Sequence, residues 1–207
     1  PHEITKAEIY NYKVKDIKGI HAIVRRGPKN DLMTIPYNQA FRSELQRASF
    51  LLNRAAELAK NKSFKKYLKM RAKALVTNKY QASDMMWMDM KNNPIDVVIG
   101  PIETYEDQLF GYRAAFEAYV LVKDMSWSQR LARYAKFLPE LQRNLPVDKK
   151  YKTEKPGGKA DLNAYEVIFY GGRSNAGAKT IAINLPNDEE VQLKKGTRRL
   201  QLKNIMR

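Results

Sequence analysis

The chain has 207 residues, of which 43% are apolar, and its 38 lysines and arginines against 22 aspartates and glutamates give a net charge of +16. This size and composition allow a substantial buried core, and the absence of cysteine excludes disulfides, thiolate metal sites and cysteine nucleophiles. No apolar run is long enough to cross a membrane and no signal sequence opens the chain, so we expect a cytoplasmic protein without a membrane partner.

The positive charge makes a basic nucleic-acid-binding module one candidate function. Its peaks are residues 60–73 and 194–199. In the first peak Phe64, Leu68 and Leu75 recur at helical spacing, which is typical of an amphipathic helix with a charged outer face. Because no zinc-finger, helix-turn-helix or aromatic RNA-binding motif accompanies these peaks, we do not expect nucleic acid as a partner.

Residues 1–94 are predicted to form a mostly helical region that begins with short strands. The runs 8–12 and 20–24 are rich in β-forming residues, which suggests a hairpin or edge strands. A first helix is indicated by an apolar stripe at Phe41, Leu45, Ala48, Leu52, Ala55 and Ala59. A lysine-rich helix over 63–76 follows, and a third helix starts at Ser83.

Residues 95–123 have the pattern of a strand, an acidic turn and a second strand. The turn gathers three carboxylates, Glu103, Glu106 and Asp107. Carboxylates on a loop between two strands suit a cationic ligand. The same spacing also fits a solvated acidic turn, and the residue types alone leave both interpretations open.

Residues 124–160 are predicted to be a helical excursion followed by a linker. Asp124 can cap a helix that runs to about Leu141. Its apolar stripe is expected to be buried and consists of Trp127, Leu131, Tyr134 and Leu138. The polar and turn-rich run 148–159 then indicates a connection.

Residues 161–193 return to β structure, beginning with a strand over 164–170. The following run, 172–180, contains the glycine, lysine and threonine of a phosphate-binding loop. However, Ala178 separates the second glycine from the lysine, and a strand pattern follows where a helix is required. A turn between two strands is the simpler interpretation.

The last predicted strand covers residues 180–185 and ends at Pro186, after which Asn187 or Asp188 can cap a helix. The amides of Asn184 and Asn187 flank the strand end. They can pair with a peptide backbone, or they can tie down the turn.

Two motifs together resemble the dipeptidyl peptidase III family of zinc metallopeptidases, and particularly its bacterial members. The first motif is Pro101–Asp107 with Phe110–Glu117, and the second is Ile183–Asp188. The resemblance extends from about Leu51 to Arg207 with order and spacing intact. It implies an α+β fold in which helices pack around a mixed or barrel-like β-sheet, as part of a two-lobed metallopeptidase.

The resemblance also implies a set of substrate-binding residues, namely Glu103, Tyr105, Ile181, Ala182, Ile183, Asn184 and Asn187. Glu103 would meet the free amino group of a peptide, and Tyr105 would line the same subsite. Asn184 and Asn187 would hold that same end, while the strand from Ile181 pairs with the peptide backbone. A buried ammonium needs such carboxylate and amide acceptors.

One departure from the family is large, because its zinc-binding helix, His-Glu-x-x-Gly-His or a shortened variant, does not occur. The only histidines are His2 and His21, which cannot replace it. We therefore expect no catalytic and no metal-binding residues in this chain. The zinc ligands are expected beyond Arg207, with residues 194–207 starting the segment that continues into the zinc lobe of the same polypeptide.

The leading hypothesis is the substrate-binding portion of a zinc-dependent dipeptidyl peptidase that removes dipeptides from the free N-terminus of peptides. By itself this portion should be inactive. The alternatives are the basic nucleic-acid-binding module and a non-catalytic peptide-binding scaffold of the same fold.

Overall fold

The computed structural model describes residues 3–12, 19–104, 110–111, 113–152, 161–172 and 180–205. The chain divides into two compact units. The first comprises Pro1–Ser83 and Ile99–Glu117, and the second comprises Asp84–Val98 and Ala118–Arg207. Among the described residues, no helix is both long enough and apolar enough to cross a membrane.

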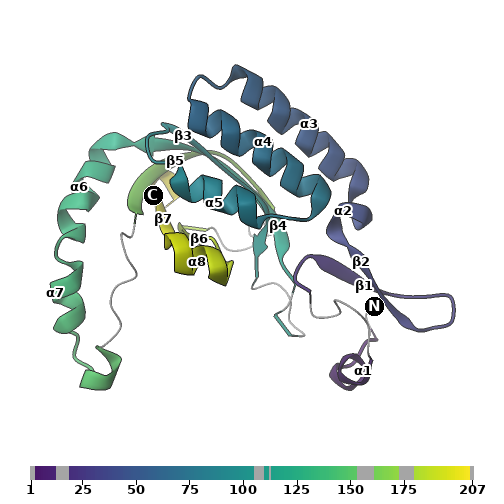
Figure 1. Ribbon diagram of the computed structural model, residues 1–207. Helices are drawn as coiled ribbons and strands as arrows, with labels where there is room; N and C mark the ends of the chain where they lie inside the picture. Colours follow the sequence, from purple (N-terminus) through teal and green to yellow (C-terminus); the bar gives the residue numbers. More distant parts are fainter. Residues whose placement is uncertain are drawn as a thin grey trace. The chain divides into compact units, whose positions relative to one another are not determined.

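Two long helices of the first unit, α3 (Arg42–Leu58) and α4 (Lys62–Thr77), lie side by side (Figure 1), with the short helix α2 (Tyr37–Ala40) before them. Asn61 starts α4 by accepting a hydrogen bond from the Phe64 amide at 3.0 Å. The predicted helices are confirmed.

The packing stripes of these helices differ in one respect from the prediction. On α3 the buried residues are Leu45, Leu52 and Ala56, whereas Ala55 is exposed. Ala56 lies four residues after Leu52, about one helical turn, so it takes the place on the packed face that was predicted for Ala55. On α4 the buried face is wider than predicted and consists of Tyr67, Leu68, Arg71, Ala72, Ala74 and Leu75.

The N-terminal segment confirms one prediction and contradicts another. The run 20–24 contributes to β1 (Ala22–Arg26), which forms an antiparallel hairpin with β2 (Leu32–Pro36). The predicted strand at 8–12 is wrong, because Lys6–Asn11 is the helix α1, started by the Thr5 side chain, which accepts from the Glu8 amide at 3.2 Å.

The central strands β3 (Ile95–Glu103) and β4 (Ala115–Asp124) confirm the predicted pair, and both contribute residues to each unit. Glu103 is the last residue of β3 rather than part of the turn. Glu106 and Asp107 lie outside the described residues.

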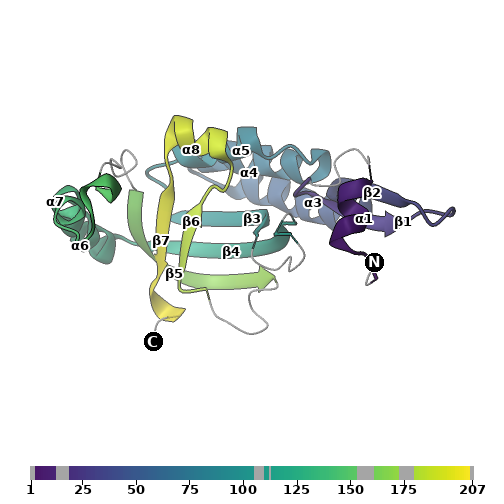
Figure 2. The ribbon, with the colours of Figure 1, turned by 90° about the horizontal axis from the view of Figure 1, so that it is seen from below.

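The second unit is built on a mixed five-stranded sheet with the order β3-β4-β5-β7-β6. Its later strands are β5 (Asp161–Gly172), β6 (Ala182–Leu185) and β7 (Arg198–Leu202). β7 runs parallel to β5 and antiparallel to β6. Figure 2 shows β5 curving, with its first half beside β7 and its second half beside β4. The predicted α+β fold with a barrel-like sheet is confirmed, although β7 itself was not predicted.

Helices α5 (Gln81–Asp89) and α8 (Glu189–Lys195) belong to the same unit, apart from the first turn of α5. Lys195 of α8 forms an ion pair with Asp89 at the end of α5, with 2.7 Å between Nζ and Oδ1. α5 starts at Gln81, two residues before the predicted start at Ser83.

A buried charged group ties α5 to the sheet. Arg198 of β7 is 1% exposed, and its Nη2 lies 3.1 Å from Oδ2 of the fully buried Asp96. Trp87 of α5 stacks on this guanidinium, with 4.4 Å between the ring centre and Cζ. Its Nε1 donates to Oδ1 of Asp96 at 2.8 Å. The Tyr165 hydroxyl accepts from Nη2 of Arg198 at 3.3 Å, so four side chains form one polar cluster inside an apolar core.

The single helix predicted from Asp124 to about Leu141 is instead two helices, α6 (Met125–Ala135) and α7 (Leu138–Arg143). Asp124 caps α6 as expected, accepting from the Trp127 amide at 2.9 Å. The predicted burial of the apolar stripe is wrong. Trp127 is 44% exposed and Tyr134 is 70% exposed. Helix α6 packs on β5, where Ser128 contacts Ala164, and the large side chains Trp127 and Tyr134 stay exposed in the part of the chain that the structure describes.

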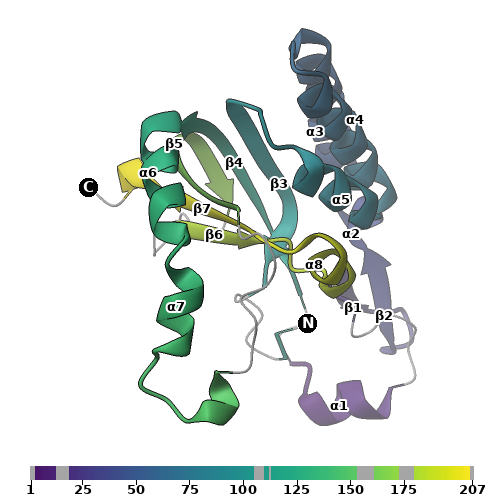
Figure 3. The ribbon, with the colours of Figure 1, turned by 60° about the vertical axis from the view of Figure 1, so that its left-hand side comes forward.

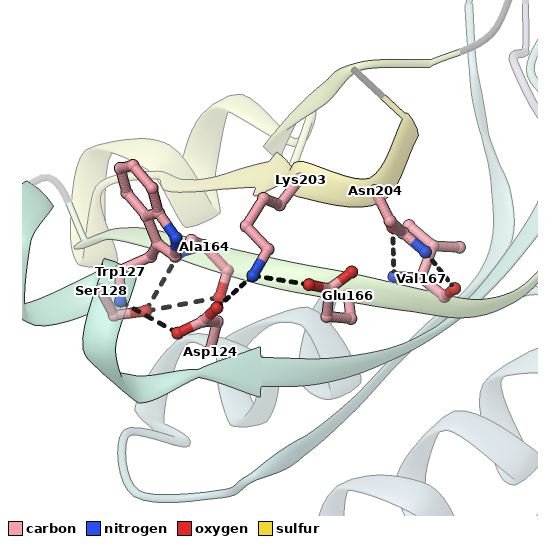
Figure 4. Close-up of polar contacts among 8 residues, drawn as sticks. All are labelled: Asp124, Trp127, Ser128, Ala164, Glu166, Val167, Lys203 and Asn204. Carbon is pink, nitrogen blue, oxygen red and sulfur yellow. Dashed lines mark hydrogen bonds and ion pairs between the residues drawn. The ribbon is translucent and has the colours of Figure 1, made fainter. Parts of the chain in front are cut away.

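Side-chain contacts fasten the start of α6 and the end of β7 to β5 (Figure 4). The Ser128 hydroxyl accepts from the Ala164 amide at 3.1 Å. Lys203, in the short helix η3 (Lys203–Ile205), forms ion pairs with Asp124 and with Glu166, the latter at 2.6 Å. Asn204 completes the set by bonding to both the amide and the carbonyl of Val167.

Candidate functional site

The predicted peptide-binding strand, β6, lies at one edge of the sheet, since it is the last strand in the order. It pairs with β7 on one side, in the register Ala182 to Gln201 and Ile183 to Leu200. Among the strands that the structure describes, it has no neighbour on its other side. An edge strand offers its unpaired backbone groups to an added strand.

The register identifies which backbone groups of β6 face outward. The Leu202 amide donates to the Ile181 carbonyl at 3.0 Å, which marks Ile181 as a residue that bonds to β7. Because antiparallel pairs alternate along a ladder, Ile183 also directs its amide and carbonyl toward β7. Ala182 and Asn184 therefore direct theirs toward the open edge.

The side chains of β6 alternate in the same way. Ile183 and Leu185 are both 7% exposed and belong to the core. Ala182 and Asn184 are exposed on the opposite face. Ile181, just before the strand, is 55% exposed. The strand is therefore anchored by two apolar residues and carries the predicted asparagine on its accessible face.

The turn after β6 is fixed by two side chains. Asp188 caps α8, because its Oδ1 accepts from the Val191 amide at 2.9 Å. Gln192 donates from Nε2 to the Pro186 carbonyl at 2.8 Å. Asn187 lies exposed between these two anchors. The prediction left open whether Asn187 or Asp188 caps the helix, and the geometry selects Asp188.

Gln192 is a supporting residue that the sequence analysis missed. It could have been predicted from its position four residues after Asp188, which places it one turn further along the same helix. From that place its amide reaches back to the turn that carries Asn187.

Glu103 ends β3 in the first unit and is partly exposed. Three residues before it, Gly100 has a φ of +146°, which a residue with a side chain adopts only with strain. A Cβ there would lie 3.4 Å from Nη1 of Arg71 and 3.5 Å from the Tyr80 ring. Gly100 thus lets β3 approach a buried guanidinium that also lies 5.7 Å from the Tyr67 ring centre.

The predicted site residues accordingly fall into two groups. Ile181, Ala182, Ile183, Asn184 and Asn187 follow one another along a single edge of the second unit, whereas Glu103 belongs to the first unit. Tyr105 lies outside the described residues.

The metal-binding side chains in the described part of the chain do not fit a zinc site. The described residues contain no group of three or more histidine, aspartate or glutamate side chains that could hold a metal ion. His21 packs instead against Tyr80, with 4.9 Å between ring centres at an interplanar angle of 67°. His2 lies outside the described residues.

Comparison with known families identifies the chain. The model of peptidase family M49 matches residues 24–207. The chain belongs to peptidase family M49. The resemblance stated from the two motifs is thereby confirmed.

Solved structures of this family share the fold over almost the whole chain. DPP III from Caldithrix abyssi superimposes with a TM-score of 0.91 at 39% identity, covering 99% of this chain and 40% of that chain. Dipeptidyl-peptidase III from Corallococcus sp. strain EGB gives a TM-score of 0.85 at 38% identity, covering 99% and 39%.

The M49 chain is also similar to curated proteins. It is 38% identical over 176 residues to Nudix hydrolase 3 of Arabidopsis thaliana, which covers 85% of this chain and 22% of that protein. It is 25% identical over 130 residues to dipeptidyl peptidase 3 of Homo sapiens, which covers 61% and 16%. The chain thus spans about a fifth of the length of these relatives.

Proposed function

We propose that this M49 chain is the substrate-binding portion of a zinc-dependent dipeptidyl peptidase and grips the free amino end of a peptide. The observation that carries the proposal is the open edge of β6. Its outward backbone groups, at Ala182 and Asn184, suit the addition of an extended peptide as a further strand. Membership of a peptidase family makes a peptide the expected ligand.

In this proposal the amides of Asn184 and Asn187 accept hydrogen bonds from the peptide ammonium. Both residues are exposed, and the turn between them is held from behind by Asp188 and Gln192. A pre-formed turn lowers the entropy cost of binding. Glu103 supplies the negative charge, and Tyr105 lines the same subsite.

Zinc would be held by other residues of the enzyme, since the donors described here do not form its site. This portion would bind substrate and fix its register without performing the hydrolysis. We propose a cytoplasmic setting, which suits a cysteine-free protein of this kind.

The test is peptide binding by the 207-residue chain, measured by calorimetry with a free-amine tetrapeptide and its N-acetylated form. We expect the Glu103→Gln substitution to weaken binding of the free-amine peptide about thirtyfold. This corresponds to the loss of a charge-assisted contact of about 2 kcal/mol. Binding of the acetylated peptide should change little, because it carries no ammonium.

Glu57→Gln is the matched control, because Glu57 is an exposed carboxylate on α3 whose side chain is 66% exposed. It should leave both affinities unchanged. Equal losses for the two peptides in Glu103→Gln would contradict the assigned role. Binding that ignores the free amine and falls steeply with salt concentration would favour the nucleic-acid alternative.

A further inference from the structure

The apolar face of α6 and α7 is unusual for a surface. Trp127 and Tyr134 lie seven residues apart on one side of α6, Phe137 directly precedes α7, and Leu141 lies on α7. All four side chains are exposed. Their exposed fractions are 44% for Trp127, 70% for Tyr134, 56% for Phe137 and 59% for Leu141. Figure 3 shows the two helices following one another, with α7 extending away from β5.

Helix α6 packs on the sheet through a different side from the one that carries Trp127 and Tyr134. Ser128 is the buried residue of α6, and its hydroxyl is bonded to Ala164 of β5. Ser128 follows Trp127 directly, so the two side chains point about 100° apart around the helix. The exposed stripe is therefore not the side by which α6 packs on the sheet. A contiguous apolar face of this kind marks an interaction site.

Positive charge borders the stripe. Arg130 lies over the Trp127 ring, with 5.0 Å between Cζ and the ring centre. Three further exposed cations follow, namely Arg133 on α6, Lys136 between the helices and Arg143 on α7. The carboxylate on the same helices is Glu140. A partner that fits this face carries apolar side chains at its centre and carboxylates around them.

The solved relatives have a long part of their chain outside the match. The Caldithrix abyssi structure matches 99% of this chain, so its fold includes the α6–α7 pair, yet the match leaves more than half of that chain outside. We propose that the α6–α7 face is the docking surface for another part of an M49 peptidase chain, one that presents apolar side chains flanked by carboxylates. This proposal does not depend on the peptide clamp.

Trp127 provides a direct probe of docking. The other tryptophan, Trp87, is 3% exposed, so an aqueous quencher such as acrylamide reports chiefly on Trp127. The 207-residue chain is mixed with the part of the Caldithrix abyssi DPP III chain that it does not match, produced as a separate polypeptide. We expect saturation at one to one, a blue shift, and at least a threefold fall in the quenching constant.

Substitutions locate the contact. Tyr134→Asp and Leu141→Asp should each weaken this association at least tenfold, because each places a charge at the centre of the apolar face. Leu58→Asp is the matched control, since Leu58 is 82% exposed on α3 of the first unit. It should change the affinity less than twofold. Circular dichroism checks that each variant retains its helices.

Several results would overturn the proposal. They are association that leaves Trp127 quenching unchanged, equal losses in Leu58→Asp, and a dimer of the 207-residue chain that protects Trp127 without the added polypeptide. A fourth is a Trp127 blue shift on vesicles of phosphatidylcholine and phosphatidylserine without binding to that polypeptide.

A second measurement applies where the separate polypeptide does not fold. Amide hydrogen exchange in the intact Caldithrix abyssi enzyme should be at least tenfold slower in the segment that matches Met125–Arg143 than in the same segment of the 207-residue chain. A helix whose apolar face is covered opens less often than one whose apolar face is exposed. Equal exchange in both proteins would overturn the proposal.

Discussion

At the scale of single residues, the stability of the second unit depends on the pair formed by Arg198 and Asp96. Both are almost completely buried, and Asp96 also accepts from the Trp87 indole. Removing one partner of such a pair leaves a charge without compensation in a medium of low dielectric. The other residues of the cluster cannot replace the guanidinium, because Trp87 and Tyr165 are uncharged.

We expect Arg198→Met to lower the free energy of unfolding by about 3–5 kcal/mol. The measurement is urea denaturation followed by circular dichroism. Arg199→Met is the matched control, because Arg199 is exposed on the same strand. It should change the free energy of unfolding by less than about 0.5 kcal/mol. Similar effects for both would show that the buried pair contributes little.

Lys203 makes stability depend on pH in two directions. Its ion pairs with Asp124 and then Glu166 raise its pKa, and its hydrogen bond to Asp124 lowers the pKa of that carboxyl. The lowered group stabilises the fold above its unfolded pKa, and this contribution is lost as pH falls through the folded pKa. The raised group stabilises the fold below its unfolded pKa, and its contribution is lost as pH rises through the folded pKa.

We therefore expect Lys203→Met to be less stable than the parent chain near neutral pH. The difference in urea midpoint should shrink both in strong acid and at strongly alkaline pH. The measurement is a series of urea titrations across this range for both proteins. A difference that stays constant across it would mean that the lysine acts through packing alone.

At the scale of elements, the four residues of β6 alternate between two roles, bonding to β7 and facing the open edge of the sheet. Ile183 bonds to β7, whereas the Ala182 amide faces the open edge. Proline lacks an amide hydrogen, and strands tolerate it where that hydrogen is not needed for the ladder. A proline scan of this strand therefore distinguishes binding from folding.

We expect Ala182→Pro to weaken peptide binding at least tenfold while changing the free energy of unfolding by no more than about 1 kcal/mol. Ile183→Pro should instead destabilise the sheet, because it removes a bond to β7. Calorimetric peptide binding and urea denaturation measure the two effects. Unchanged binding in Ala182→Pro would argue against peptide addition at this edge.

The elements also show how much of the fold could be predicted from the sequence. The strands around Gly100 and the helix capped by Asp188 were predictable, because alternation and capping residues act locally. β7 was not, since its buried positions are Arg198, Leu200 and Leu202, and the arginine hides the alternation. Its insertion between β5 and β6 depends on contacts distant in sequence.

The candidate site was predictable from the motifs only as a list of residues. The register that turns Ala182 and Asn184 outward depends on β7, and the support of the turn depends on Gln192. The misjudged stripe on α6 has a different cause. Amphipathic spacing such as that of Trp127 and Tyr134 predicts a face that seeks a partner, without saying whether the partner lies within the same unit.

At the scale of the whole molecule, the net charge of +16 over 207 residues must repel itself in the compact state. The Debye length falls from about 30 Å at 0.01 M to about 10 Å at 0.1 M ionic strength, so added salt screens this repulsion. We expect the melting temperature to rise between these concentrations of sodium chloride, measured by calorimetry. A fall would show that the ion pairs, such as Lys195 with Asp89, outweigh the general repulsion.

The brevity of β6 has a consequence for any guest chain. The strand is followed at once by Pro186, which offers no amide hydrogen, and then by the start of a helix. Backbone pairing along the open edge of β6 must therefore stop at Pro186, and a guest chain that extends past this proline gains no further backbone hydrogen bonds there. Pro186 thus sets one limit on the length of a peptide segment that can pair with β6. The short edge also leaves little surface on which copies of the protein could stack.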